Sequence, residues 1–392
     1  TASYADGESF RALAKKTFTI TGFCEGYGIR RYFTNAVAGF SADALPAQAQ
    51  LNLTARTEKI QTDTYGQIYS LAQRYGMMTE ADYGTSGIYQ FRWASGYDKY
   101  LNAMRYRVKE ILSFDATDLP SLKRWLYDAA DGSTHGGLLT FSSQSTGWTI
   151  NNNYNGPSNT GYHSLLTHLA TSGAHAMTIV GYDDLVEFSD TDGQKHKGAF
   201  IVCNTWGTFS HDQGRFYLPY WFFTDHQHTD IVLSSEMQAV RVATYDPKIV
   251  FKVKLKYSSR NDLSFGTARR DNGNTSSTPQ YNYAQAFFNA GGDYPMQGQF
   301  LGDDIEIAIN ATVAGAQPSD GEVYFIAVKK AAIGKTVGNG TVEAISLDDY
   351  RGETPVEHKC ISPSFPTAVN PGIIGCWVRP SDNRTDRYKL SA

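Results

Sequence analysis

The sequence has few cysteines, no long apolar segment and no block of like charge. Four cysteines in 392 residues are too few for a disulfide-built scaffold. No apolar run is long enough to cross a bilayer as a helix, so we expect no membrane span. The 35 basic and 39 acidic residues give a net charge of −4, and no Lys- or Arg-rich block occurs. These features predict neither nucleic acid nor an anionic membrane surface as a partner.

The overall composition is that of a soluble globular protein with more than one domain. At 41% hydrophobic and 19% charged residues the chain is ordinary, and its length suits two domains. The 25 Tyr and 21 Phe, with loops rich in Asn, Ser, Thr and Gly, are typical of exported, β-rich proteins. We therefore expect an extracellular, periplasmic or cell-surface protein whose signal or propeptide is absent from this chain.

Residues 1–243 mix helical and strand patterns. Helical spacing of apolar residues follows Cys24 and predicts further helices over 65–76, 97–112 and 118–130. In the last of these, Asp118 is a good N-cap and Pro120 fits the first turn. Short apolar runs bounded by turn residues then predict strands, and they are found in 137–143, 175–184, 198–207 and 214–223. The polar segment 185–198 is predicted to be a hairpin loop.

The pattern changes near Asp246-Pro247, after which no helix of any length is predicted. "IVFKVKLKY" (249–257) alternates apolar residues with lysines, as expected of a strand with one solvated face. Similar runs follow, separated by Gly, Asn and Asp at the spacing of a β-sandwich. The sequence thus predicts an α+β domain over 1–243 followed by an all-β sandwich over 244–392.

Two strand motifs that lie 29 residues apart carry a chemically coherent pair, His175 in "HAMTIVGYDD" and Asn204 in "FIVCNTWG". A thiol needs a base to become a thiolate at neutral pH, and a His can supply that base and later act as the acid. An Asn amide oxygen can hold the His ring in a useful orientation. Adjacent strands joined by a turn would bring His175 and Asn204 together.

These motifs resemble the C-terminal half of papain-family cysteine peptidases. The matching residues are His175, Ala176, Val180, Gly181, Tyr182, Asn204, Thr205, Trp206 and Gly207. The resemblance covers about residues 18–225 and is strongest from 173 to 220. It implies a papain-like two-lobe fold with a C-terminal β-sandwich of the bacterial multi-domain type. It also implies that His175 is the general base and acid, that Asn204 orients it, and that Trp206 shields their hydrogen bond beside Gly207.

The same resemblance nominates Cys24 as the nucleophile. The family places its catalytic thiol at the N-terminus of a long helix, where the helix end favours the thiolate. Cys24 precedes a predicted helix and lies 151 residues before His175. Gly66 falls near the family's glycines that line the substrate cleft. On the residues alone, a small buried cysteine at a helix start remains the alternative.

Two departures from the family pattern keep a second function open. Phe18 stands where the family has the Gln that donates to the oxyanion, and Glu25 stands where it has a Trp. A lost oxyanion donor costs about 10²–10³ in rate, and a carboxylate beside a thiolate disfavours the thiolate. The first hypothesis is an exported cysteine peptidase; the alternative is an inactive papain-fold protein that binds peptide or serves as an assembly subunit.

The remaining candidates concern structure rather than chemistry. Cys360 and Cys376 lie 16 residues apart, and in an exported protein we expect a disulfide, with two buried thiols as the alternative. Six further histidines are scattered, and solvated loop histidines are a better interpretation than metal ligands: His163, His168, His196, His211, His226 and His228. We expect no metal or organic cofactor. The expected partners are a peptide or protein substrate and, through the C-terminal domain, a glycan or cell-envelope component.

Overall fold

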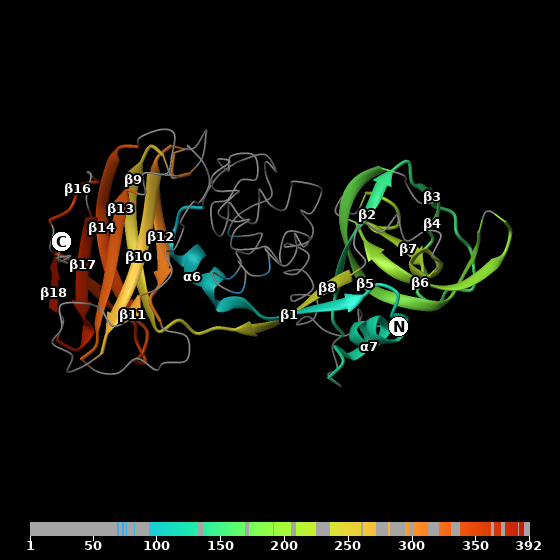
Figure 1. Ribbon diagram of the computed structural model, residues 1–392, viewed down its shortest axis with the longest axis horizontal. Helices are drawn as coiled ribbons and strands as arrows, with labels where there is room; N and C mark the ends of the chain where they lie inside the picture. Colours follow the sequence, from blue (N-terminus) through green and yellow to red (C-terminus); the bar gives the residue numbers. More distant parts are fainter. Residues whose placement is uncertain are drawn as a thin grey trace. The chain divides into compact units, whose positions relative to one another are not determined.

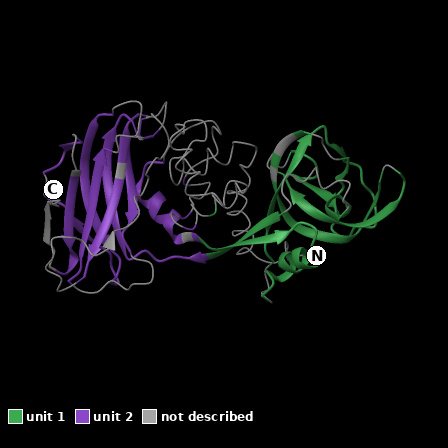
Figure 2. Cartoon of the chain, in the orientation of Figure 1, with its two compact units in different colours: residues 1–29, 63–70, 108–242 green, residues 30–62, 71–107, 243–392 purple. Residues whose placement is uncertain are grey.

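A computed structural model of the chain (Figure 1) describes most of the molecule from residue 94 onward. The described residues are 69, 73, 76, 82, 94–131, 136–168, 172–190, 192–204, 209–224, 236–259, 262–271, 281–282, 295–297, 302–312, 321–330, 338–361, 364–369, 373–382 and 384–387. By internal packing the chain falls into two compact units (Figure 2), the first containing 108–242 and the second containing 71–107 and 243–392. The domain boundaries 1–243 and 244–392 stay a prediction.

An eight-stranded sheet dominates the first unit. Its order is β1-β8-β2-β5-β6-β7-β4-β3, and β4 pairs with β7 in parallel. The strands are β1 (Tyr106–Asp115), β2 (Leu139–Thr146), β3 (Thr149–Asn151), β4 (Leu165–His168), β5 (Ser172–Ser189), β6 (Lys195–Cys203), β7 (Arg215–Pro219) and β8 (Glu236–Thr244). The strands predicted over 137–143, 175–184, 198–207 and 214–223 correspond to β2, β5, β6 and β7. The two predicted motifs therefore lie on neighbouring strands β5 and β6.

Helix α7 (Leu119–Asp128) confirms the prediction for 118–130. The Asp118 carboxylate accepts from the Ser121 N–H at 3.2 Å, which satisfies a donor at the open helix end. Trp125 lies on the buried face, and its indole N–H donates to the Leu138 carbonyl at 2.9 Å. This bond ties α7 to the chain that enters β2. A short helix, α8 (Trp221–Thr224), follows β7.

The predicted helix over 97–112 is wrong in its second half. Helix α6 (Tyr97–Arg105) ends at Arg105, and the chain continues directly as β1. Strand β1 pairs with β8, which lies about 130 residues further along the chain. Because a helical pattern is a weak preference, pairing with a distant strand overrides it. Val108 is buried in this strand while Lys109 and Glu110 are exposed.

The predicted hairpin loop over 185–198 is also wrong in extent. Strand β5 continues to Ser189 and β6 begins at Lys195, so the turn covers only the residues between them. Val186 and Phe188 are buried at alternate positions, which a sheet face can accommodate and a solvated loop cannot. In the turn, Asp190 accepts from His196 Nε2 at 2.8 Å, and this bond is the main cause that lowers the pKa of Asp190.

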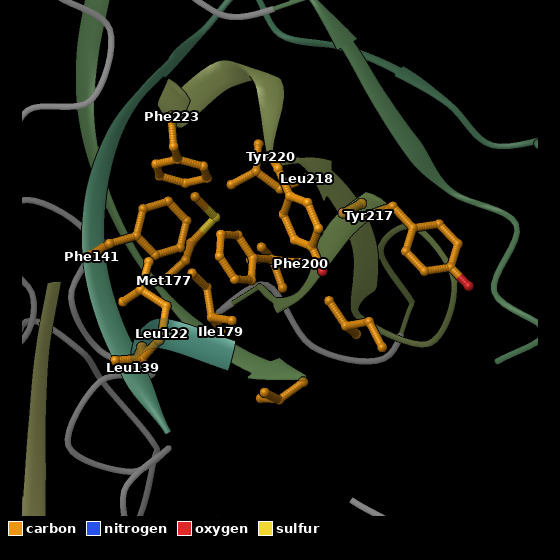
Figure 3. Packing of buried hydrophobic residues seen from close by; sticks show 14 of the residues in the cluster. Leu122, Leu139, Phe141, Met177, Ile179, Phe200, Tyr217, Leu218, Tyr220 and Phe223 are labelled. Carbon is orange, nitrogen blue, oxygen red and sulfur yellow. The ribbon is translucent and has the colours of Figure 1, made fainter. Parts of the chain in front are cut away.

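Aromatic side chains fill the core of the first unit (Figure 3). Phe141, Phe200 and Phe223 are at most 2% exposed, and Phe223 meets the other two rings edge-on at centroid distances of 5.5–5.9 Å. Edge-to-face aromatic pairs of this kind add stability beyond the area they bury. The core thus gives β2, β5, β6 and α8 a rigid common face.

Two antiparallel sheets make up the second unit. One has the order β11-β10-β13-β17-β18 and the other β12-β9-β14-β15, with β16 beside β14. The strands are β9 (Ile249–Tyr257), β10 (Leu263–Arg270), β11 (Tyr281–Asn282), β12 (Asp304–Asn310), β13 (Val323–Lys330), β14 (Gly340–Asp349), β15 (Val356–Lys359), β16 (Thr367–Ala368), β17 (Ile373–Arg379) and β18 (Arg384–Arg387). As predicted, β9 buries Phe251, Val253 and Leu255 and turns its lysines outward. Among the described residues of 244–392 no α-helix occurs, and Pro380–Asp382 forms a 3₁₀ turn.

The inner faces of the two sheets meet at a pair of cysteines. Cys360 follows β15 and its N–H donates to the Ile345 carbonyl on β14, whereas Cys376 lies on β17 of the other sheet. Both side chains are buried, and their Sγ atoms lie 2.8 Å apart as separate thiols. A contact between the two sheets at their buried faces is the arrangement of a β-sandwich. Helix α6, which comes earlier in the chain, packs on β12.

We expect Cys360 and Cys376 to form a disulfide when the protein is produced in an oxidising compartment. Closing a loop of this length is worth about 3 kcal/mol, so reduction should lower the free energy of unfolding of the second unit by that order. Alkylation without reductant, followed by peptide mass spectrometry, should recover the two cysteines as one linked pair. Full alkylation of both thiols in unfolded, unreduced protein would show that they remain free.

Candidate active site

Strand register places His175 and Asn204 on one face of the sheet. Thr178 lies opposite Cys203 in the β5–β6 pair, so the next position, Asn204, falls opposite Met177. Alternate residues of a strand share a face, which puts His175 on the same face as Met177. The side chain of Asn204 therefore leaves the end of β6 on the face that carries His175.

A buried hydrogen bond joins the two predicted residues. His175 Nε2 and Asn204 Oδ1 lie 2.8 Å apart, and the residues are 2% and 6% exposed. The Asn204 backbone is itself held, because its N–H donates to the Gly214 carbonyl at 2.8 Å. A ring that donates through Nε2 can exchange a proton with a nucleophile only through Nδ1. The bond thus fixes both the tautomer and the orientation of the imidazole.

Trp148 packs against His175, a contact that the sequence did not predict. The indole meets the imidazole edge-on at a centroid distance of 5.5 Å and meets Phe216 at 5.6 Å. Its N–H donates to the Gln144 carbonyl, which fixes the ring. Trp148 therefore covers one side of the His175 ring. Trp148 follows β2 in the sequence. It comes to lie beside His175 because β2 pairs with β5, with Ser143 opposite His175.

His211 is part of the site rather than a solvated loop residue, which corrects the sequence interpretation. It lies four residues before β7 and has a left-handed φ of +51°. Its Nε2 lies 3.1 Å from Asn204 Nδ2, and its ring meets Phe216 edge-on at 5.3 Å. Burial lowers the pKa of His211, and the neighbouring His175 lowers it further. The neutral imidazole can therefore accept a hydrogen bond from the Asn204 amide.

The side chains that share the sheet face of His175 are largely apolar. A small cavity on this face is lined by Phe141, Trp148, Leu166, Met177, Phe216 and Leu218. Ser143 also borders it and lies opposite His175 in the β2–β5 pair. Electrostatic interactions are stronger in such low-dielectric surroundings than in water. The His175–Asn204 bond is protected from solvent because both residues are buried.

Of the predicted site, His175, Asn204, Cys360 and Cys376 lie among the described residues. The structure brings His175 and Asn204 together, while Cys24, Gly66, Trp206 and Gly207 lie outside the described residues. Cys203 adjoins Asn204, but burial raises the pKa of its thiol to about 12, so it stays protonated at neutral pH.

Within the described residues no three His, Cys, Asp or Glu side chains gather as a metal site. No helix in that part is both long and apolar enough to span a membrane.

Comparison with solved structures finds cysteine proteases. Xylellain from Xylella fastidiosa aligns at 17% identity and a TM-score of 0.26, over 46% of this chain and 60% of that one. Cwp84, a surface layer associated protein of Clostridium difficile, aligns through its cysteine protease and lectin-like domains at 13% identity and a TM-score of 0.30. That match covers 82% of this chain and 68% of the solved Cwp84 chain. Bromelain from Ananas comosus aligns at 15% identity and a TM-score of 0.29, over 62% of this chain and 93% of bromelain.

Other comparisons give no match. No protein-family profile matches the sequence. No curated protein matches it either.

Proposed function

We propose that this chain is an exported papain-like cysteine peptidase that hydrolyses peptide bonds with Cys24, His175 and Asn204. The observation that carries the proposal is the buried 2.8 Å bond from His175 Nε2 to Asn204 Oδ1. A structural histidine could satisfy its ring nitrogens with backbone carbonyls. Here a side-chain amide at the end of the next strand holds the ring, as a catalytic base requires.

The proposed reaction proceeds in two steps. His175 takes the proton of the Cys24 thiol, and the thiolate attacks the peptide carbonyl carbon. His175 then gives that proton to the leaving amine as the C–N bond breaks, which leaves a thioester on Cys24. A water molecule, deprotonated by His175, hydrolyses the thioester and restores the thiol. Asn204 keeps the imidazole aligned throughout, and no step needs a metal or organic cofactor.

Thiol labelling tests the proposal without knowledge of the substrate. At neutral pH we expect iodoacetamide to label Cys24 about tenfold faster than an unperturbed thiol, because the proposed base His175 raises the thiolate fraction of Cys24. Peptide mass spectrometry would give the rate at each cysteine. Cys203 is an internal control, since its raised pKa keeps it protonated. The rate at Cys24 should fall to that of a free thiol in His175→Ala.

A Cys24 that labels no faster than a free thiol would overturn the peptidase proposal. In that case the Phe18 and Glu25 departures favour the second candidate, an inactive papain-fold protein that binds peptide or a surface component. Binding of a protein substrate with no cleavage would support this candidate. We further propose that the β-sandwich, 244–392, contacts a glycan or cell-envelope component of an exported assembly.

A further inference from the structure

We propose that His211 is a positioning residue that holds the Asn204 amide in the orientation His175 needs. The inference deepens the proposed peptidase function and rests on it. An Asn side chain presents an oxygen and an NH₂ group of nearly identical shape, so its orientation depends on its partners. His175 meets the oxygen at 2.8 Å and His211 Nε2 meets the nitrogen at 3.1 Å. The three side chains thus form one chain of hydrogen bonds.

The direction of each bond in this chain follows from chemistry. His175 Nε2–H donates to Asn204 Oδ1, and the Asn204 NH₂ group donates to His211 Nε2. His211 can accept only as a neutral imidazole whose proton is on Nδ1. If Asn204 rotated by half a turn, its NH₂ would face the Nε2–H of His175 and two donors would meet. His211 therefore makes the productive orientation the favoured one.

The backbone around His211 is built to hold this position. A left-handed φ of +51° is uncommon for a residue with a side chain, although His is among the residues that tolerate it. The Gly214 N–H donates to the Ser210 carbonyl at 2.7 Å, and Asp212 and Arg215 exchange backbone bonds of 3.0–3.1 Å. The Asp212 carboxylate also accepts from the His163 N–H at 2.9 Å. The turn is tied at several points, so the imidazole is held rigidly toward Asn204.

The surroundings of His211 favour the neutral ring. The ring faces His175 from β5, Asn204 from the end of β6 and Phe216 from β7. Of the charged residues in its own turn, Asp212 accepts from His163, and Arg215 donates to the Gln213 carbonyl and lies over the Tyr162 ring. Burial and, after it, the neighbouring His175 lower the pKa of His211. The ring is therefore neutral and accepts a hydrogen bond at neutral pH. It becomes protonated, and stops accepting, only at a pH below the ordinary pKa of a histidine.

Three variants separate positioning from turn stability. His211→Gly removes the acceptor, and we expect kcat to fall about tenfold with KM little changed, since one orienting hydrogen bond is lost. Gln213→Gly is the matched control, because Gln213 has the same φ of +51° and is exposed. His211→Gln keeps an acceptor without a titrating group. It should retain kcat at neutral pH and remain active to a lower pH than the wild type.

A spectroscopic readout keeps the test independent of hydrolysis. In ¹⁵N-histidine-labelled protein at neutral pH, we expect His211 Nε2 to resonate as an unprotonated nitrogen and Nδ1 as a protonated one. A protonated Nε2, or equal activities for His211→Gly and Gln213→Gly, would overturn the inference. If no hydrolysis is seen but the tautomer is as expected, the peptidase proposal fails and the hydrogen-bond chain stands.

Discussion

Cys24→Ala is expected to lose at least about 10⁴-fold in kcat for peptide hydrolysis, with the fold intact. Without the nucleophile, substrate binding and electrostatic stabilisation still accelerate hydrolysis, but they supply only a small part of the total rate enhancement. The measurement is cleavage of a fluorescence-quenched protein substrate such as casein at neutral pH. Thermal unfolding of the variant should match that of the wild type.

The matched control is Cys203→Ala, which removes a thiol next to Asn204 in sequence. Because the pKa of Cys203 is raised to about 12, that thiol is no nucleophile at neutral pH, and most of the hydrolysis should remain. The double variant Cys24→Ala/His175→Ala should lose no more than Cys24→Ala alone, since residues that act as one unit are not additive. Equal hydrolysis by Cys24→Ala and wild type would show that Cys24 is structural.

The sequence predicted those elements whose signals are local. The helix α7 could be predicted because Asp118 and Pro120 mark its start within a few residues. The strand β9 could be predicted because its lysines alternate with apolar residues over nine positions. The boundary between α6 and β1 could not, because the partner strand β8 is distant in sequence. The residues around 105 therefore carry no local pattern that predicts pairing with β8.

The same distinction applies to the site. His175 and Asn204 were predicted to meet because each lies in a recognisable motif, and the structure places them 2.8 Å apart. Trp148 and His211 were missed, because their contacts depend on strand register and on a left-handed turn. The only signal for His211 was its place in the short connection "SHDQG" before β7. A His there is uninformative until the position of the Asn204 amide is known.

A buried ion pair in the second unit leads to the largest expected stability effect. Arg269 Nη1 on β10 lies 3.3 Å from Oε1 of Glu322, which immediately precedes β13, and the two side chains are only 6% and 2% exposed. Glu322 also accepts from the Tyr324 hydroxyl, and burial followed by this bond raises the pKa of Tyr324. Asp271, which is more exposed, provides a second carboxylate at 2.8 Å from Arg269. Glu322 is therefore the buried countercharge of Arg269.

We expect Glu322→Gln to lower the free energy of unfolding of the second unit by about 3 kcal/mol. Gln keeps the shape and an acceptor for Tyr324, so the change isolates the lost charge, and removing one partner of a buried pair leaves the other charge uncompensated. Asp304→Asn is the control, because the Lys256–Asp304 pair is about half exposed at 3.6 Å and should contribute under about 1 kcal/mol. Thermal unfolding of the full chain, with hydrogen exchange of β10 and β13 peptides, separates the second unit from the first. A Glu322→Gln variant no less stable than Asp304→Asn would mean that Asp271 alone compensates Arg269.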